Sequence, residues 1–493
     1  MMDCILAIDQ STSATKAILF DIRGHVVDQA AQEHQQYYPR PGWVEHDAEA
    51  IYVNLRQVLQ TLLQRRADLV PHIRAVSLTN QRETFVIFDR TTGRPLYRAI
   101  VWQCRRGEAL CRELEANGYG RRVQEATGLK LDTYFPASKI RWLLDDQPVL
   151  RRALEEGQAL LGTMDTYLLY RLTRRACFAT EHTNACRTLL YNISRLDWDE
   201  DLCALFGVPL RALPAVLPSQ AVFGQTDLEG LLPHALPLCG VMGDSQAALF
   251  AEGCFQPGMA KVTLGTGSSV LLNIGSALRF AQEGIVTTIA WVYRGQPTYA
   301  YEGIINYAGA TIAWLKDQLH LIADPRETET LARSVPDNGG VYLVPAFVGL
   351  SAPYWKPGAR AAIIGLSPAS TREHVVRAAL ESIAYQARDV LGLMSAAAGL
   401  PLSEVQADGG MVGNRFLLQF LADVTRLQVR AASAGELSAL GAVLCGCLGL
   451  GIYGSLDELQ ALEHGFELYR PLMDAAAADA AYAGWQRAVA RVL

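Results

Sequence analysis

The chain has 493 residues, of which 50% are hydrophobic and 19% are charged, and its formal net charge is −6. This composition supports a large folded core and argues against an intrinsically disordered chain. The acidic balance argues against a general nucleic-acid binder, because phosphate contacts need clustered lysine and arginine. At about 150 residues per domain the length allows roughly three domains, but two large α/β domains fit equally well.

No segment of the sequence predicts secretion or membrane insertion. The opening residues, 1–4, are not a basic region followed by a long apolar run. The longest weakly polar stretch, 439–454, holds five glycines and is too short for a span of about 20 residues, so it predicts a buried helix. We therefore expect a soluble, cytoplasmic protein. The ten cysteines are scattered, and only Cys445 and Cys447 are close together, which predicts structural thiols rather than a zinc site.

The first half of the chain begins with an apolar run at 5–8, a polar run at 9–16 and a second apolar run at 17–21. This order predicts a hairpin of two strands with a polar turn. Hydrophobic periodicity then predicts helices over 48–64 and 106–114 and strands over 75–79 and 84–88.

The second half repeats this opening pattern. Residues 238–242 predict a strand that runs into a helix over 244–250. Apolar runs at 260–264 and 270–273 enclose a second polar turn, which suggests two similar halves with a boundary near residue 250. A strand at 405–407, a glycine-rich turn at 408–414 and an amphipathic helix from 415 to 424 complete the pattern.

Three polar turns therefore follow predicted strands, at 9–16, 265–269 and 408–414, and small or hydroxyl-bearing residues dominate them. Such turns suit a nucleoside triphosphate, because glycine lets backbone N–H groups reach phosphate oxygens and hydroxyls add donors. Asp9 is placed to hold Mg²⁺ by its carboxylate. The alternative for the glycine-rich turn at 408–414 is a tight turn without a ligand. No Walker-type phosphate loop occurs at these turns, which argues against that fold.

Other candidates have a functional and a structural interpretation. Asp244, at a predicted strand-to-helix turn, would accept a substrate proton or cap the helix. Arg82 and Glu83 would bind hydroxyl groups in a pocket or form a surface ion pair of little energetic value. Trp102 and Tyr134 would line a pocket or fill the core.

The chain resembles the FGGY family of carbohydrate kinases over nearly its whole length, and within that family it is most similar to the glycerol kinases. The resemblance rests on long collinear blocks, at 38–47, 79–84, 99–106, 162–166, 345–347, 352–355 and 365–381. It implies an α/β, actin-like and hexokinase-like ATPase fold, with two ribonuclease-H-like domains flanking a cleft. The N-terminal domain, 1–250, would be the polyol-binding side, and the C-terminal domain, 251–493, the nucleotide-binding side.

The resemblance also implies roles for individual residues. Asp244 matches the catalytic base, and Asp9 matches the position associated with the metal. The positions that match the polyol site are Arg82, Glu83, Trp102, Tyr134, Asp244, Ser245 and Ser269. The positions assigned to the nucleotide are Thr12, Ser13, Lys16, Thr266, Gly267, Gly309, Gly410 and Asn414.

The implied activity is ATP- and Mg²⁺-dependent phosphorylation of a small polyol, with glycerol giving sn-glycerol 3-phosphate as the first choice. Ser245 and Ser269 depart from the pattern of the glycerol kinases, which usually have glutamine and phenylalanine there. These smaller side chains would enlarge the pocket, so a kinase for a four- or five-carbon polyol or ketose, such as xylulose or erythrulose, is the alternative. A non-catalytic, actin-like nucleotide-binding protein is a second alternative. Beyond the polyol we expect no nucleic-acid partner and no membrane insertion, and a homo-oligomer is an open possibility.

Overall fold

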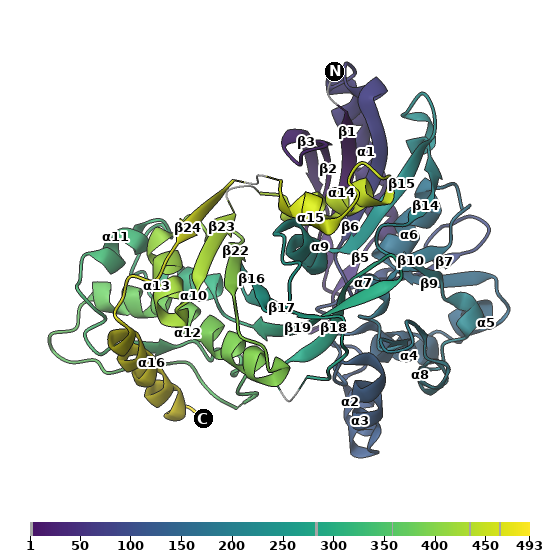
Figure 1. Ribbon diagram of the computed structural model, residues 1–493. Coiled ribbons are helices and arrows are strands. Elements are labelled where there is room, and N and C mark those ends of the chain that lie inside the picture. The colour runs from purple at the N-terminus through teal and green to yellow at the C-terminus, as the bar shows by residue number, and fades with distance from the viewer. Residues whose placement is uncertain (1–2, 282–283, 357, 433–434, 463–464) are drawn as a thin grey trace. The chain divides into compact units, whose positions relative to one another are not determined.

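The computed structural model describes residues 3–281, 284–356, 358–432, 435–462 and 465–493. The chain divides into two compact units, which are described separately (Figure 1). Unit 1 holds residues 1–253 and two later segments, 287–299 and 436–462. Unit 2 holds residues 254–286, 300–435 and 463–493.

The main sheet of unit 1 has the strand order β14-β15-β6-β1-β2-β3. The strands β1 and β2 form the predicted hairpin, and β6 and β15 pair in parallel beside β1. The bounds are β1 Cys4–Gln10, β2 Ala14–Asp21, β3 Val26–Glu33, β6 Ile73–Asn80, β14 Val222–Thr226 and β15 Leu236–Gly243. The predicted strands at 5–8, 75–79 and 238–242 are therefore confirmed, and each is longer than its apolar run.

A second sheet of unit 1 has the order β4-β5-β8-β7-β9. Its strands are β4 Gln36–Tyr37, β5 Glu45–His46, β7 Phe85–Asp89, β8 Ala99–Ile100 and β9 Ala159–Thr163. The first helices are α1 Ala48–Arg65, α2 Glu108–Ala116, α3 Tyr119–Thr127, α4 Pro136–Asp146, α5 Pro148–Glu155 and α6 Met164–Leu172. The later helices and short strands are β10 Ala179–Glu181, α7 His182–Ala185, β11 Tyr191–Asn192, β12 Asp197–Trp198, α8 Glu200–Phe206, β13 Ala215–Leu217 and α9 Asp244–Ala251.

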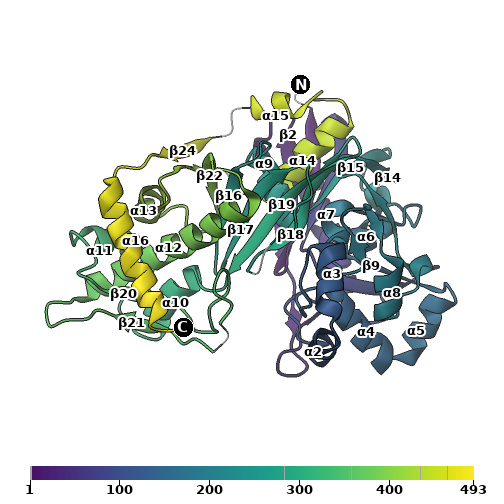
Figure 2. The same cartoon turned by 60° about the horizontal axis from the view of Figure 1, so that its bottom comes forward.

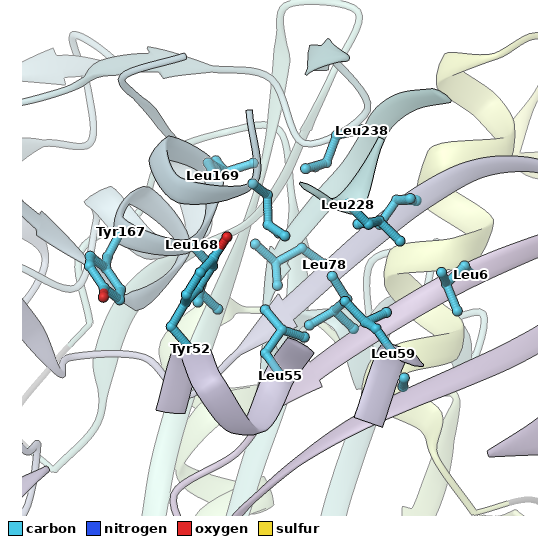
Figure 3. Close-up of a cluster of buried hydrophobic side chains, with 14 of the residues drawn as sticks. Leu6, Tyr52, Leu55, Leu59, Leu78, Tyr167, Leu168, Leu169, Leu228 and Leu238 are labelled. Atoms are coloured by element: carbon cyan, nitrogen blue, oxygen red, sulfur yellow. The ribbon is translucent and has the colours of Figure 1, made fainter. Parts of the chain in front are cut away.

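The helix α1 covers one face of the main sheet of unit 1. Asp47 caps it by accepting hydrogen bonds from the amides of Glu49 and Ala50, both at 3.0 Å. Its buried side chains recur every three to four residues, as the periodicity predicted. They pack with side chains from β1, β6, β15 and α6 in one apolar cluster (Figure 3); among its members are Leu6, Tyr52, Leu55, Leu59, Leu78, Tyr167, Leu168, Leu169, Leu228 and Leu238.

The helix α14, Leu437–Gly449, returns late in the chain and packs on β15, β6 and α9 (Figure 1). It confirms a buried helix within the predicted stretch. Its glycines let it approach closely, since a Cβ atom at Gly441 would lie 1.8 Å from the carbonyl oxygen of Ala247. A Cβ atom at Gly446 would lie 2.6 Å from the carbonyl oxygen of Cys239. Glycine is therefore required at both positions.

The sheet of unit 2 includes, in spatial order, the later part of β19 (residues 300–305), β17, β16, β22, β23 and β24. The helix α12 packs on β17, α13 and α16 (Figure 2). The strand bounds are β16 Met259–Leu264, β17 Ser268–Gly275, β19 Gln296–Ile305, β22 Glu404–Asp408, β23 Gln428–Ala432 and β24 Phe466–Tyr469. The helices are α10 Gly309–Asp317, α11 Glu327–Arg333, α12 Arg372–Ala398, α13 Arg415–Thr425 and α16 Ala475–Ala490. A small hairpin joins β20 Tyr342–Val344 to β21 Ala362–Ile364.

Among the helices that the structure describes, none combines the length and the apolar character that crossing a membrane requires. All ten cysteines are free thiols, and nine of them are buried. Burial raises the pKa of several of these thiols, to about 12 for Cys203, Cys239 and Cys447. These thiols are therefore uncharged at neutral pH, as expected for structural cysteines.

Candidate functional site

The candidate site of unit 1 lies at the carboxyl ends of three neighbouring parallel strands. In the register of the sheet, Asp9 on β1 is opposite Thr79 on β6, and Asn80 on β6 is opposite Gly243 on β15. Residues that directly follow these strands therefore gather at one edge of the sheet. This topology brings together Asp9, Arg82, Glu83 and Asp244, which come from three distant segments of the sequence.

The guanidinium group of Arg82 links the two carboxylates of this cluster. Its Nε lies 3.3 Å from Asp244 Oδ1 and 3.6 Å from Glu83 Oε1, and its Nη1 donates to Gln246 Oε1 at 3.0 Å. Glu83 Oε1 also accepts from Arg187 Nε at 2.6 Å, and Arg187 is fully buried. Arg82 and Glu83 are buried as well, so the surface-pair interpretation of these two residues is wrong.

Glu83 holds an unusual backbone conformation, with a φ of 58°. A non-glycine residue with positive φ is uncommon and persists where its surroundings determine it. Two interactions hold this turn in place. Glu83 forms its buried pair with Arg187, and the amide of Thr84 donates to the carbonyl of Arg82 at 2.7 Å. This turn directs the Glu83 carboxylate back into the cluster of charges.

Asp244 is the first residue of α9, and the residue in the capping position is Gly243. The capping interpretation of Asp244 is therefore wrong, although its Oδ1 does accept from the amide of Ser245 at 2.7 Å. A Cβ atom at Gly243 would lie 2.7 Å from Cγ of Arg82, so glycine there makes room for the arginine side chain. The side chain of Asp244 remains 37% exposed, which leaves its carboxylate accessible to a substrate. Ser245 is half-buried beside it.

Trp102 and Tyr134 form an aromatic pair in unit 1, with ring centroids 5.4 Å apart. Both residues are half-buried, unlike the fully buried aromatic residues of the core. The indole Nε1 of Trp102 donates to Thr12 Oγ1 at 3.0 Å, which joins this aromatic pair to the turn that follows β1. The aromatic pair therefore lies outside the apolar core, and the indole of Trp102 gives it a polar contact.

Asp9 and Lys16 are strand residues and are not part of the turn that the sequence predicted. They are cross-strand partners in the β1–β2 hairpin, whose turn begins at Ser11. Burial raises the pKa of the Asp9 carboxyl to about 7, against the opposing effect of Lys16. The ammonium of Lys16 is 2.7 Å from both carboxylate oxygens of Glu436, which directly precedes α14.

The turn itself carries Thr12 and Ser13. The carbonyl of Thr12 lies 2.8 Å from Nε2 of His34, and the amide of His34 donates to the carbonyl of Ser13 at 3.0 Å. Because Thr12 Oγ1 accepts from Trp102, its own hydroxyl proton is available to a further acceptor. Ser13 is exposed at the tip. Both hydroxyls would suit a phosphate group.

Unit 2 contains the other expected residues. The turn from Gly265 to Gly267 supports the start of α10, because the amides of Gly309 and Ala310 donate to the carbonyls of Gly265 and Thr266, both at 2.9 Å. A Cβ atom at Gly309 would lie 2.8 Å from the carbonyl oxygen of Gly265, so the close approach requires glycine. Thr266 is exposed on this turn, and Ser269 follows on β17, half-buried.

The glycine-rich turn after β22 lies beside this arrangement in unit 2. The amide of Met411 donates to the carbonyl of Leu264, the last residue of β16, at 3.2 Å. Gly410 is exposed, and a Cβ atom there would contact nothing within 4 Å. Asn414 caps α13 by accepting from the amide of Leu417 at 3.0 Å, and its Nδ2 donates to Thr328 Oγ1 at 3.1 Å. Asn414 therefore has a structural role in addition to any contact with a nucleotide.

The sequence predictions missed four residues that contact the expected ones, namely Lys139, Arg187, Gln246 and Glu436. Lys139 and Arg187 are both fully buried, and Arg187 is the only charged residue between positions 183 and 194. An isolated charge was the signal that could have identified Arg187, because a buried charge needs partners. Lys139, Gln246 and Glu436 carry no such signal.

Comparison with known proteins assigns the family. The model of the N-terminal domain of the FGGY family of carbohydrate kinases matches residues 4–251, and that of the C-terminal domain matches residues 260–450. Glycerol kinase 1 of Thermotoga maritima is 46% identical over 489 residues, which cover 99% of each chain. Glycerol kinase of Carboxydothermus hydrogenoformans is 46% identical over 487 residues, with 99% of this chain and 97% of the relative covered.

A solved structure agrees with these matches. The crystal structure of Plasmodium falciparum glycerol kinase with ADP superposes with a TM-score of 0.95 at 35% identity, covering 100% of this chain and 98% of the other. The expected α/β, actin-like and hexokinase-like fold is thereby confirmed. The expectation that the protein is a kinase, and not a non-catalytic nucleotide-binding protein, is confirmed as well. The chain belongs to the FGGY family of carbohydrate kinases.

Proposed function

We propose that this protein phosphorylates glycerol with ATP and releases sn-glycerol 3-phosphate and ADP. The observation that carries the proposal is the charge cluster of unit 1, in which a partly exposed carboxylate, Asp244, lies 3.3 Å from the buried guanidinium of Arg82. The relatives named above, which carry the name glycerol kinase over almost the whole chain, support glycerol as the substrate.

In this proposal the primary hydroxyl of glycerol donates its proton to the Asp244 carboxylate as its oxygen attacks the γ-phosphorus of ATP. The bond from that phosphorus to the β,γ-bridging oxygen breaks, and ADP leaves. Arg82 holds Asp244 in place, while Arg82 and Glu83 bind the other hydroxyls and the Trp102–Tyr134 pair contacts the carbon chain. General-base assistance of this kind contributes roughly 10²–10⁴-fold to the rate.

In unit 1 the groups proposed for the nucleotide are Thr12, Ser13 and Lys16. Taken separately, the groups proposed in unit 2 are Thr266, Gly267, Gly309, Gly410 and Asn414. Asp9 fits a magnesium ion, because it is a buried carboxylate whose pKa burial raises to about 7, and a divalent cation would favour its ionised form. Magnesium would supply charge neutralisation at the phosphates. Within the described ranges, no group of three or more acidic, histidine or cysteine side chains could hold a metal by itself. A metal held mainly by phosphates and water suits this arrangement.

The test is ATP turnover against glycerol, dihydroxyacetone, erythritol, xylitol, D-xylulose and L-erythrulose. The expected result is the highest kcat/KM with glycerol. A higher kcat/KM with a four- or five-carbon compound would replace glycerol by the alternative substrate class, which Ser245 and Ser269 favour because they are smaller than the usual family residues. No turnover with any of these compounds would reject the proposed function.

A further inference from the structure

Lys139 is a buried cation behind the aromatic pair of the proposed polyol site. It lies in α4, Pro136–Asp146, and none of its surface is exposed. Lysine is almost never fully buried unless its ammonium group has partners. Here Nζ donates to three backbone carbonyls, those of Val101 at 3.3 Å, Trp102 at 3.2 Å and Tyr134 at 3.2 Å.

These carbonyls belong to two separate segments of the chain. Val101 and Trp102 directly follow β8, whereas Tyr134 lies in the loop that leads into α4. An ammonium group has three donors, and the three contacts match that number. One side chain therefore fixes the backbone of Trp102 relative to that of Tyr134, the two residues whose rings lie 5.4 Å apart.

Burial disfavours the charged form of Lys139. It lowers the pKa of the Lys139 ammonium to about 8, although the carboxylates of Glu83 and Asp132 oppose the shift. Removing the ammonium would leave three carbonyl groups without this donor, which costs stability as well as geometry. What an apolar side chain cannot supply is three directed hydrogen bonds to two loops.

We propose that Lys139 is a positioning residue for polyol binding, which holds Trp102 and Tyr134 in the geometry that contacts the substrate carbons. This inference rests on the proposed function, because Trp102 and Tyr134 line the polyol site only in that proposal. It adds a residue that touches no substrate and sets affinity for the polyol without setting affinity for ATP.

The experiment compares the wild type with Lys139→Met, which keeps the length of the side chain and removes its donors. Binding of glycerol to the nucleotide-free protein is measured by calorimetry, and KM for glycerol and for ATP by steady-state kinetics. We expect the Kd and KM for glycerol to rise about 10- to 100-fold, since small displacements of positioning groups have effects of this size. The KM for ATP should stay within about twofold, and kcat at saturating glycerol should change far less than KM.

Lys316→Met is the matched control, because it makes the same substitution at an exposed lysine of α10. It should leave both KM values unchanged. A Lys139→Met protein with unchanged affinity for glycerol would overturn the inference, and so would equal losses of affinity for glycerol and for ATP. If Lys139→Met does not fold, Lys139→Gln retains an amide donor, and about a fivefold weaker affinity for glycerol is expected; unchanged affinity in Lys139→Gln would overturn the inference.

The wild type separates this inference from the proposed function. A wild type that phosphorylates no compound of the panel rejects the proposed function. If the wild type phosphorylates a polyol and Lys139→Met binds that polyol with unchanged affinity, only the role of Lys139 is rejected. If that polyol is not glycerol, the same comparison is made with the compound that the wild type prefers.

Discussion

The β1–β2 hairpin of unit 1 and the β16–β17 hairpin of unit 2 have the same pairing pattern and different chemistry. In each, the first strand pairs antiparallel with the second and parallel with a later strand, β6 in unit 1 and β22 in unit 2. The second cross-strand pair from the turn is Asp9 with Lys16 in unit 1. In unit 2 the corresponding pair is Thr263 with Ser269, two hydroxyl residues.

In unit 2 the carboxylate at this level of the sheet is on the neighbouring parallel strand instead of on the hairpin. Thr79 is opposite Asp9 in unit 1, whereas Asp408 is opposite Thr263 in unit 2, where it lies 3.7 Å from Lys261. A repeated backbone arrangement therefore does not repeat its chemistry. Unit 1 combines this hairpin with the charges of Arg82, Glu83 and Asp244, while unit 2 offers glycines and hydroxyls that suit close approach of a phosphate.

The largest expected effect tests whether the reactive carboxylate belongs to unit 1. Asp244→Asn should lower kcat by about two to four orders of magnitude and leave ATP binding intact, because the amide is too weak a base to accept the hydroxyl proton. Rapid kinetics for kcat and calorimetry for ATP measure the two effects. Asp146→Asn, at an exposed position of α4, is the control and should retain wild-type kcat. Near wild-type turnover in Asp244→Asn would remove Asp244 from its proposed role.

The second test concerns Glu83, the buried carboxylate of unit 1 that is proposed to accept hydrogen bonds from the substrate hydroxyls. Glu83→Gln should lower kcat/KM for glycerol by about 10- to 100-fold, because a charge-assisted hydrogen bond is worth about 1.5–3 kcal/mol. The KM for ATP should change little. Glutamine is preferable to alanine, because it keeps the side-chain volume beside Arg187. Equal effects on both substrates would indicate a role in folding instead.

A third test uses the raised pKa of Asp9, for which unit 2 has no equivalent at the corresponding position. Metal binding requires the ionised carboxylate, and a pKa of about 7 leaves Asp9 protonated below that pH. The kcat/KM for ATP should therefore fall about tenfold as pH decreases from 8 to 6, and should be nearly constant above pH 8. The same profile for glycerol at saturating ATP and magnesium should shift to lower pH, because the bound metal favours the ionised form. A flat profile for ATP would contradict the assignment of Asp9.

The smallest expected effect concerns the hydroxyl pair of unit 2. Ser269→Phe would bury about 40 Å² of apolar surface against the glycerol carbons if Ser269 lies beside them, which is worth roughly 1 kcal/mol, or about fivefold in affinity. It should also exclude longer substrates by steric overlap. Measurement of kcat/KM over the substrate panel gives the ratio of glycerol to four- and five-carbon compounds. An unchanged ratio would show that Ser269 does not line the pocket.

The sequence predicted those parts of the molecule that depend on local patterns. The two hairpins, α1 and the strand-to-helix step at 236–251 follow from apolar periodicity, and the structure confirms them. The extent of the strands was less predictable, since polar residues such as Asp9 and Lys16 continue the β1–β2 ladder instead of forming its turn. Side-chain polarity alone therefore placed the turn too early.

Contacts between distant segments were the part that the sequence could not predict. Glu436 reaches Lys16 across 420 positions of the chain, and Arg187 reaches Glu83 across 104. No periodicity encodes such pairs, because they depend on how the sheet orders its strands. The aromatic pair was assigned by family resemblance, whereas Lys139, its support, was visible only once the carbonyls around it were located.

The late return of α14 has a consequence for synthesis of the chain on the ribosome. Residues 1–253 leave the ribosome first, but the face of their sheet formed by β6 and β15 receives its covering helix only when residues 437–449 follow. At about 5–20 residues per second, this interval of nearly 200 residues lasts roughly 10–40 seconds. During that time the nascent first half exposes an apolar sheet face, so folding of unit 1 is completed only when translation is nearly over. A gene fragment ending at residue 253 would expose this face permanently, and we would expect it to aggregate or to bind chaperones.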